Sequence, residues 1–144
     1  MNQTNVERDN AKPIIIFSAA QDTKSESENN QGHEYSIEQL KEHGISFKEV
    51  QEVYTYDNGQ RGKERSLLVE LHGKDDEKLV RALCSTFNQE CYLYADDTRQ
   101  GYLMTNDGTL KQTLGTLKAI TEKQAETEDN YTYCPHLEQY FIFE

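Results

Sequence analysis

A tight turn between two strand-like segments constrains the fold of this chain more than any other feature. Residues 47–56 and 64–71 have the pattern of two strands. The turn over residues 57–62 contains Asn58-Gly59, a pair that readily takes the positive φ angles a β-hairpin needs. The two segments are therefore predicted to pair as an antiparallel hairpin.

A helix and a third strand are predicted directly after this hairpin. Asp75 or Asp76 is suited to cap the start of the helix. A third strand follows over residues 91–95. Four apolar residues recur at helical spacing between the cap and this strand: Leu79, Val80, Leu83 and Phe87.

Three polar residues at the ends of these elements are candidates for a functional site. Glu64 lies where the turn becomes a strand, Tyr54 lies near the end of the preceding strand, and Gln89 precedes the third strand. Each also has an ordinary structural explanation. These are a solvated edge carboxylate, a half-buried strand aromatic and an amide at a helix end.

The N-terminal part of the chain adds a strand and a short helix. Residues 14–17 form an apolar run typical of a buried central strand. Ser18 and Ala19 follow it, and their small side chains let a ligand approach the backbone. Residues 21–32 are polar and are predicted as a loop, and a short helix is predicted over residues 33–43.

The length of 144 residues suits one domain. Residues 1–12 are polar and without periodicity, so they are predicted as a flexible N-terminal arm, and residues 13–144 as a single α+β domain. Further strands are predicted over residues 102–105 and 110–120, with a short acidic helix after them. The aromatic tail over residues 131–143 is predicted to pack on the body or on a neighbouring subunit.

The order of these elements predicts a particular fold class. The order β-α-β-β-α-β, followed by a hairpin, matches an α/β (α+β) fold of the ferredoxin-like sandwich type. Such a fold has a mainly antiparallel sheet with two helices on one face. The other sheet face then needs covering, and together with the aromatic tail this predicts a homotrimer.

Composition narrows the classes of protein to which this chain can belong. A net charge of −11 argues against a nucleic-acid binder, which neutralises phosphates with clustered basic residues. The histidines have no metal-ligand spacing and no phosphate-binding glycine motif is present, so neither a metal nor a cofactor is expected. No membrane-span or signal pattern is visible, and a cytoplasmic location is expected. The three cysteines lack the spacing of a disulfide framework or a zinc site: Cys84, Cys91 and Cys134.

Six short segments in fixed order carry a further signal: Ile15-Ile16-Phe17-Ser18-Ala19, Glu28 with Asn30, Leu40 to Gly44, Val53-Tyr54, Glu64 to Val69, and Asn88 to Leu93. Over residues 13–120 this set resembles the phage-encoded S-adenosylmethionine-degrading enzymes, first named hydrolases and later argued to be lyases. The resemblance implies a trimer of α/β sandwich subunits with sites between subunits. It also implies an essential strand-start glutamate and a tyrosine near the substrate, which here fall on Glu64 and Tyr54. His33 departs from the arginine that related chains carry in the first helix.

The resemblance also implies a reaction. The sulfonium of S-adenosylmethionine is an activated leaving group, so holding the substrate's own carboxylate near its γ-carbon supplies most of the rate. The products would be 5′-methylthioadenosine and homoserine lactone. Glu64 would grip the α-ammonium and Tyr54 would lie near the sulfonium. The backbone of Ser18 and Ala19 would take the adenine edge, and Gln89 would bind substrate or fix Glu64.

Three alternatives stay open at this point. A hydrolase would use Glu64 as the general base for water. A regulatory trimer would bind a nucleotide without chemistry. An acidic decoy would imitate DNA and so counter restriction, although the acidic residues here are interleaved with 15 Lys and Arg residues. A phage enzyme would counter restriction differently, by depleting the methyl donor of the host.

Overall fold

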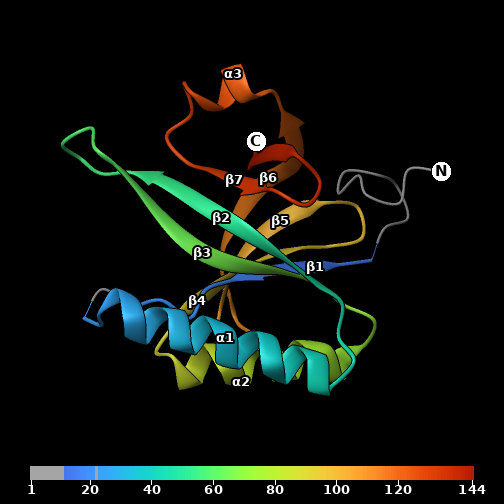
Figure 1. Cartoon of the computed structure of the whole chain (residues 1–144). Coiled ribbons are helices and arrows are strands. Elements are labelled where there is room, and N and C mark those ends of the chain that lie inside the picture. Colours follow the sequence, from blue (N-terminus) through green and yellow to red (C-terminus); the bar gives the residue numbers. More distant parts are fainter. Residues whose placement is uncertain (1–11, 22) are drawn as a thin grey trace.

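The computed structural model describes residues 12–21 and 23–144, which form eight strands and three helices. The strands are β1 (Ile14–Phe17), β2 (Phe47–Thr55), β3 (Arg61–Glu70), β4 (Cys91–Ala95), β5 (Gln100–Thr105), β6 (Leu110–Ile120), β7 (Tyr131–Cys134) and β8 (Gln139–Phe143). The helices are α1 (Glu26–Glu42), α2 (Lys74–Thr86) and α3 (Glu122–Ala125). The strands form a closed antiparallel barrel in the order β1-β3-β2-β7-β8-β6-β5-β4 (Figure 1).

The ferredoxin-like sandwich predicted from the order of elements is wrong, because the sheet closes on itself. β7 pairs with β2, β8 pairs with β6, and β7 and β8 pair with each other. The aromatic tail thus packs on the body as two strands that complete the barrel wall, which leaves no open sheet edge. The inner face of the sheet is covered by the opposite wall, so an open face no longer argues for a trimer.

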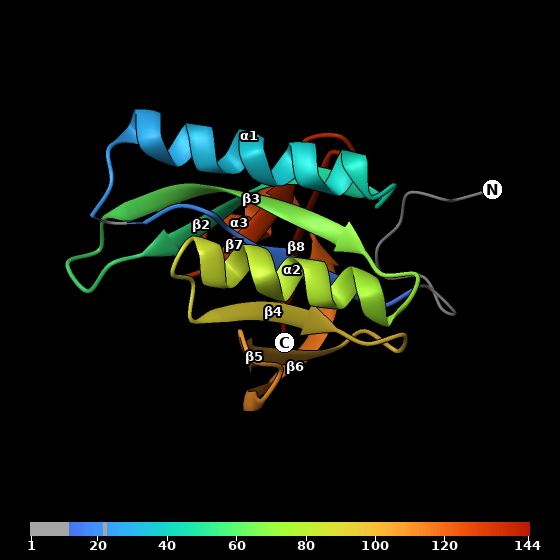
Figure 2. The same cartoon turned by 90° about the horizontal axis from the view of Figure 1, so that it is seen from below.

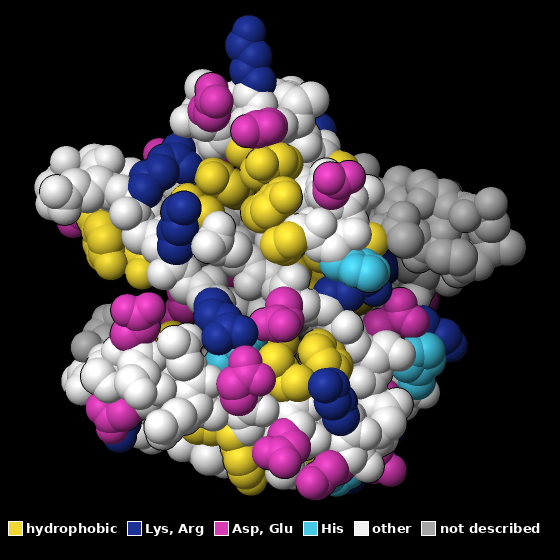
Figure 3. Space-filling model, in the orientation of Figure 1, with side chains coloured by type: hydrophobic (Ala, Val, Ile, Leu, Met, Phe, Trp, Pro, Cys, Tyr) yellow, Lys and Arg dark blue, Asp and Glu magenta, His cyan; other side chains and the backbone are white. Residues whose placement is uncertain are grey.

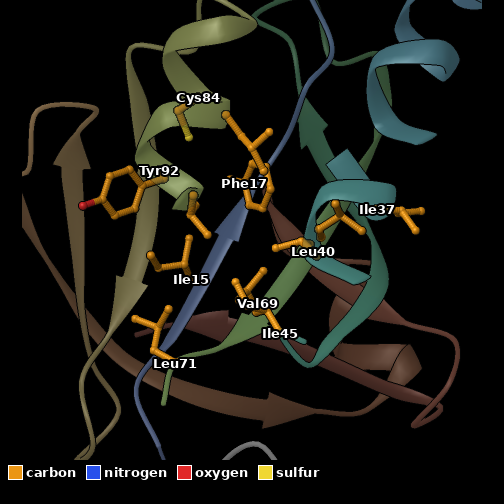
Figure 4. Packing of buried hydrophobic residues seen from close by; sticks show 12 residues of the cluster. Ile15, Phe17, Ile37, Leu40, Ile45, Val69, Leu71, Cys84 and Tyr92 are labelled. Atoms are coloured by element: carbon orange, nitrogen blue, oxygen red, sulfur yellow. The ribbon is translucent and has the colours of Figure 1, made fainter. Parts of the chain in front are cut away.

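The apolar residues form two cores, one on each side of the barrel wall. Along β1, Ile14 and Ile16 point into the barrel, whereas Ile15 and Phe17 point outward, because successive strand residues face opposite sides. The outer core joins the wall to α1 and α2, which lie side by side beneath it (Figures 2 and 4). Its main residues are Ile15, Phe17, Ile37, Leu40, Leu67, Val69, Val80, Leu83 and Tyr92.

The hairpin predicted around Asn58-Gly59 is confirmed. The backbone N–H of Tyr56 donates to the carbonyl of Gln60 at 2.8 Å, and Gly59 has a φ of 85°. A positive φ of this size costs glycine little, which explains the sharp turn at this position. β2 and β3 pair in unbroken register from the turn inward, and this register places the site residues described below.

Helix α1 begins earlier than predicted, so the loop expected over residues 21–32 is wrong from Glu26 onward. The Ser25 hydroxyl accepts a hydrogen bond from the Glu28 N–H at 3.1 Å, and the Glu28 carboxylate accepts one from the Ser25 N–H at 3.2 Å. These two bonds form a capping box, which satisfies two backbone donors at the start of the helix. Local hydrogen bonds therefore start the helix at Glu26 although its first turns are polar.

The predictions for the remaining elements are confirmed, apart from one cap. Gly73 occupies the N-cap of α2 without a side-chain bond, whereas Asp76 accepts from the backbone N–H of His72 at 2.9 Å. The predicted N-terminal arm lies outside the described residues except for Lys12, and the single domain stays a prediction. None of the described helices has both the length and the apolar character needed to cross a membrane.

Candidate functional site

A cavity of about 280 Å³ opens at the end of the barrel where β1 ends and β4 begins. Cavities in the mouths of barrels are common small-molecule sites. We call it the barrel-mouth cavity. Its lining residues are Ile16, Phe17, Ser18, Glu52, Val53, Tyr54, Glu64, Ser66, Gln89, Cys91, Tyr92, Leu93, Leu103 and Asn130.

The register of β2 and β3 aims several polar side chains into this cavity. Glu52 lies directly opposite Glu64, and Tyr54 lies directly opposite Gly62. Because side chains alternate along a strand and Val50 belongs to the inner core, Glu52 and Tyr54 point inward as well. Two carboxyl groups and a tyrosine therefore share one inner surface of the barrel.

The ring of Tyr54 lies across Gly62. A Cβ placed on Gly62 would come within 2.3 Å of the Tyr54 ring, a distance that real Cβ atoms do not show. Glycine at this position thus lets the ring approach the backbone of β3. The Tyr54 hydroxyl lies 3.3 Å from that of Tyr56, whose ring meets the Tyr54 ring edge-on. These contacts fix the ring at the rim of the cavity.

The carboxyl group of Glu52 has a pKa well above its ordinary value. Burial away from water raises the pKa of Glu52 to about 7, while a hydrogen bond from Thr132 opposes this shift and the charge of Glu64 adds to it. The Thr132 hydroxyl donates to Glu52 Oε1 at 2.9 Å. Near neutral pH, Glu52 therefore exists in both its neutral and its charged form.

A second cavity, of about 390 Å³, meets the first at Tyr54 and Glu64, which line both. We call it the helix-side cavity, because α1 forms one of its walls. Unlike the barrel-mouth cavity, it is lined by several basic side chains. The basic residues among its lining are Lys24, His33, Lys63 and Arg65.

Ion pairs hold two of these basic residues, Arg65 and His33, against neighbouring carboxylates. Arg65 and His33 both contact Glu49 Oε1 at 2.8 Å, and Arg65 also contacts Glu34 Oε1 at 3.2 Å. The hydrogen bond from Arg65, followed by that from His33, holds the pKa of Glu49 below its usual value. His33 is thus buried with a carboxylate partner beside the site.

The structure brings together four of the five residues predicted from the sequence. Tyr54, Glu64, Ser18 and Gln89 line the barrel-mouth cavity, whereas Ala19 lines a separate cavity between α1 and the end of α2. The Ser18 hydroxyl donates to the Arg65 carbonyl at 3.2 Å. The Gln89 amide donates to the Ala20 carbonyl, which ties the start of β4 to the end of β1.

Several polar residues of the cavity were not predicted from the sequence, and two of them bear on its chemistry. Glu52 is one, and its signal was its place two residues before Tyr54, at an inward position of an alternating strand. Ser66 is the other; it is 1% exposed, and its hydroxyl has no hydrogen-bond partner among the described residues. Buried polar groups are normally paired, so Ser66 is suited to meet a ligand or water in the cavity.

One face of the molecule carries charges of both signs. Figure 3 shows acidic and basic side chains interspersed over one face of the molecule, with no long row of carboxylates. Among the described residues, no group of three or more His, Cys, Asp or Glu side chains is arranged to hold a metal ion.

One family model matches nearly the whole of the chain that the structure describes. The model of a family described as the S-Adenosylmethionine lyase family matches residues 15–144. The match includes the strands that bear Tyr54 and Glu64, and it extends through the C-terminal strands that close the barrel. A comparison with curated proteins finds no match.

Proposed function

Because the chain belongs to the S-adenosylmethionine lyase family, we propose that it binds S-adenosylmethionine in the barrel-mouth cavity and cleaves it there by an intramolecular reaction. One observation carries the proposal. Glu52, Tyr54 and Glu64 line the cavity together, and among the described residues no Lys, Arg or His lines it. A pocket with carboxyl groups and an aromatic ring but no cation favours a positively charged ligand, as a sulfonium is.

The reaction needs no group beyond the substrate and these side chains. The substrate's carboxylate attacks its own γ-carbon, a carbon–oxygen bond forms, and the carbon–sulfur bond breaks with its electron pair going to sulfur. The products are homoserine lactone and 5′-methylthioadenosine. The protein's task is then to hold the methionine chain in the curled shape from which this ring closes.

The position of each side chain supports the role proposed for it. Glu64 stands at the junction of the two cavities, where it grips the α-ammonium and so fixes the attacking end of the substrate. Tyr54 places its ring against the sulfonium. Ser18 and Gln89 lie at the ends of β1 and β4, where their backbone and amide groups meet the adenosine part.

The hydrolase alternative is tested by the origin of the product oxygen. The pure protein is incubated with S-adenosylmethionine in heavy-oxygen water, and freshly made products are identified by mass spectrometry. The lyase reaction gives lactone without solvent label, because the nucleophile belongs to the substrate. Homoserine that forms without a lactone precursor, or label in fresh lactone, would instead favour Glu64 as a general base for water.

The assembly and the biological role are proposals as well. The family resemblance supports a homotrimer with sites between subunits, in the cytoplasm of a host cell. There a phage enzyme of this kind would deplete the methyl donor and so counter restriction. Light scattering at micromolar concentration tests the assembly, and a stable monomer with full activity would exclude a site shared between subunits.

A further inference from the structure

Two carboxyl groups face each other across β2 and β3 inside the barrel. Glu52 and Glu64 are directly opposed in the register, which places their Cβ atoms about 4.5–5.5 Å apart. Both line the barrel-mouth cavity, and Glu52 is held on its other side by Thr132 of β7. The two carboxyl groups thus lie on neighbouring strands, and a third strand supplies the hydroxyl that donates to Glu52.

The other titratable groups that line the barrel-mouth cavity are two tyrosines and a cysteine, whereas Glu64 also borders the basic side chains of the helix-side cavity. From β2 the cavity receives Tyr54, and from β4 it receives Cys91 and Tyr92. The residues that reach it from β1 and from the segments before β4 and β7 are uncharged, and among the described residues no basic side chain lines it. Carboxylates at directly opposed positions of neighbouring strands repel, and this repulsion together with burial favours a proton on one of them.

We propose that Glu52 and Glu64 share one proton, that this proton resides on Glu52, and that the neutral Glu52 acts as a positioning residue for the reaction at Glu64. Two asymmetries assign the proton to Glu52. Glu52 lines the barrel-mouth cavity, which has no basic side chain among the described residues, whereas Glu64 also borders the helix-side cavity with its basic side chains. Burial away from water favours the neutral form of Glu52.

This assignment rests on the proposed function, because its kinetic consequence depends on the charge of the substrate. The positive charge on sulfur disappears as the carbon–sulfur bond breaks. A second negative charge in the cavity therefore stabilises the bound substrate more than the transition state. Ionisation of Glu52 should lower KM and lower kcat together, while a neutral Glu52 keeps kcat high.

The test measures kcat and KM from pH 5.5 to pH 9 for the wild type, Glu52→Gln and the surface control Glu70→Gln. In the wild type and the control, kcat should fall by about tenfold as pH rises through neutrality, with KM falling in parallel. Glu52→Gln should keep the low-pH kcat throughout. Any titration of the substrate itself affects all three proteins alike and cancels in their ratios.

A second variant tests the direction of the effect. Thr132→Val keeps the shape of the buried side chain but removes the hydroxyl that favours the charged form of Glu52. The fall in kcat should therefore move to higher pH in this variant. A profile that is flat in the wild type, or a fall that persists unchanged in Glu52→Gln, would overturn the proposal.

An infrared measurement separates this inference from the proposed function. A protonated carboxyl group gives a carbonyl stretch that should be present near pH 6, decline through neutrality and be missing in Glu52→Gln. A wild type with this band but without turnover would refute the proposed reaction and the kinetic role of Glu52. A wild type that degrades S-adenosylmethionine but lacks the band would refute the shared proton alone.

Discussion

The wild type should lose stability as pH rises, because Glu52 is buried away from water, and Glu52→Gln should not show this loss. The pKa of Glu52 in the folded protein is raised from 4.5 to about 7. Below pH 4.5 the carboxyl group is protonated in the folded and the unfolded state alike. Between these two values the unfolded chain releases its proton while the folded protein keeps it, so the contribution of this group is present at low pH and lost as pH rises through 7.

The size of this effect follows from the same shift. A change of about 2.5 pKa units at 1.36 kcal/mol per unit corresponds to about 3 kcal/mol of unfolding free energy. That is a large part of the roughly 5–15 kcal/mol by which a domain is usually stable. It is an upper value, because the side chain of Glu52 is only partly buried.

The assay is urea unfolding of the wild type and Glu52→Gln at several pH values between 4.5 and 8, at one protein concentration. The difference in unfolding free energy should grow over this range in favour of the variant, by up to about 3 kcal/mol. Glu70→Gln, whose parent side chain is 43% exposed and pairs with His72, should show a growth of less than about 1 kcal/mol, because an exposed ion pair contributes little. A difference between Glu52→Gln and the wild type that is the same at every pH would refute the reasoning.

Two further substitutions test the local geometry. Gly62→Ala places a methyl group against the Tyr54 ring and should lower kcat/KM by about tenfold or more while the fold survives. Its control is Gly73→Ala, whose methyl group meets no atom within 4 Å and should leave the kinetics unchanged. Ser25→Ala removes one half of the capping box and should lower the unfolding free energy, measured by urea unfolding, by about 1 kcal/mol. A loss below about 0.3 kcal/mol would contradict the role of this cap.

Local patterns in the sequence predicted most elements but not how the sheet closes. The turn at Asn58-Gly59 has a mechanism that acts over a few residues, so the β2–β3 hairpin could be predicted. Alternation along a strand shows which side chains share a face, but it does not show which strand lies alongside. The pairing of β7 with β2 joins segments about 80 residues apart, and no short-range pattern encodes it.

The start of α1 was missed for a different reason. Its first turns are polar throughout, so hydrophobic periodicity gives no signal there. The sequence did contain the signature of a capping box, a serine at position 25 followed three residues later by Glu28.

The candidate site was partly predictable. Tyr54 and Glu64 stand next to the turn, and the resemblance to a known family drew attention to them. Glu52 was missed because a glutamate in a polar strand segment usually faces solvent. Only the barrel register shows that position 52 points inward, opposite Glu64.

The central claim is that the Glu64 carboxylate holds the substrate in the barrel mouth, and the turnover of Glu64→Gln tests it most directly. The substitution keeps the shape of the side chain and removes its charge, so the rate of S-adenosylmethionine degradation should fall by about 100-fold or more while unfolding stays cooperative. Glu70→Gln on the same strand should keep the wild-type rate. A Glu64→Gln protein that degrades the substrate at nearly the wild-type rate would contradict the claim.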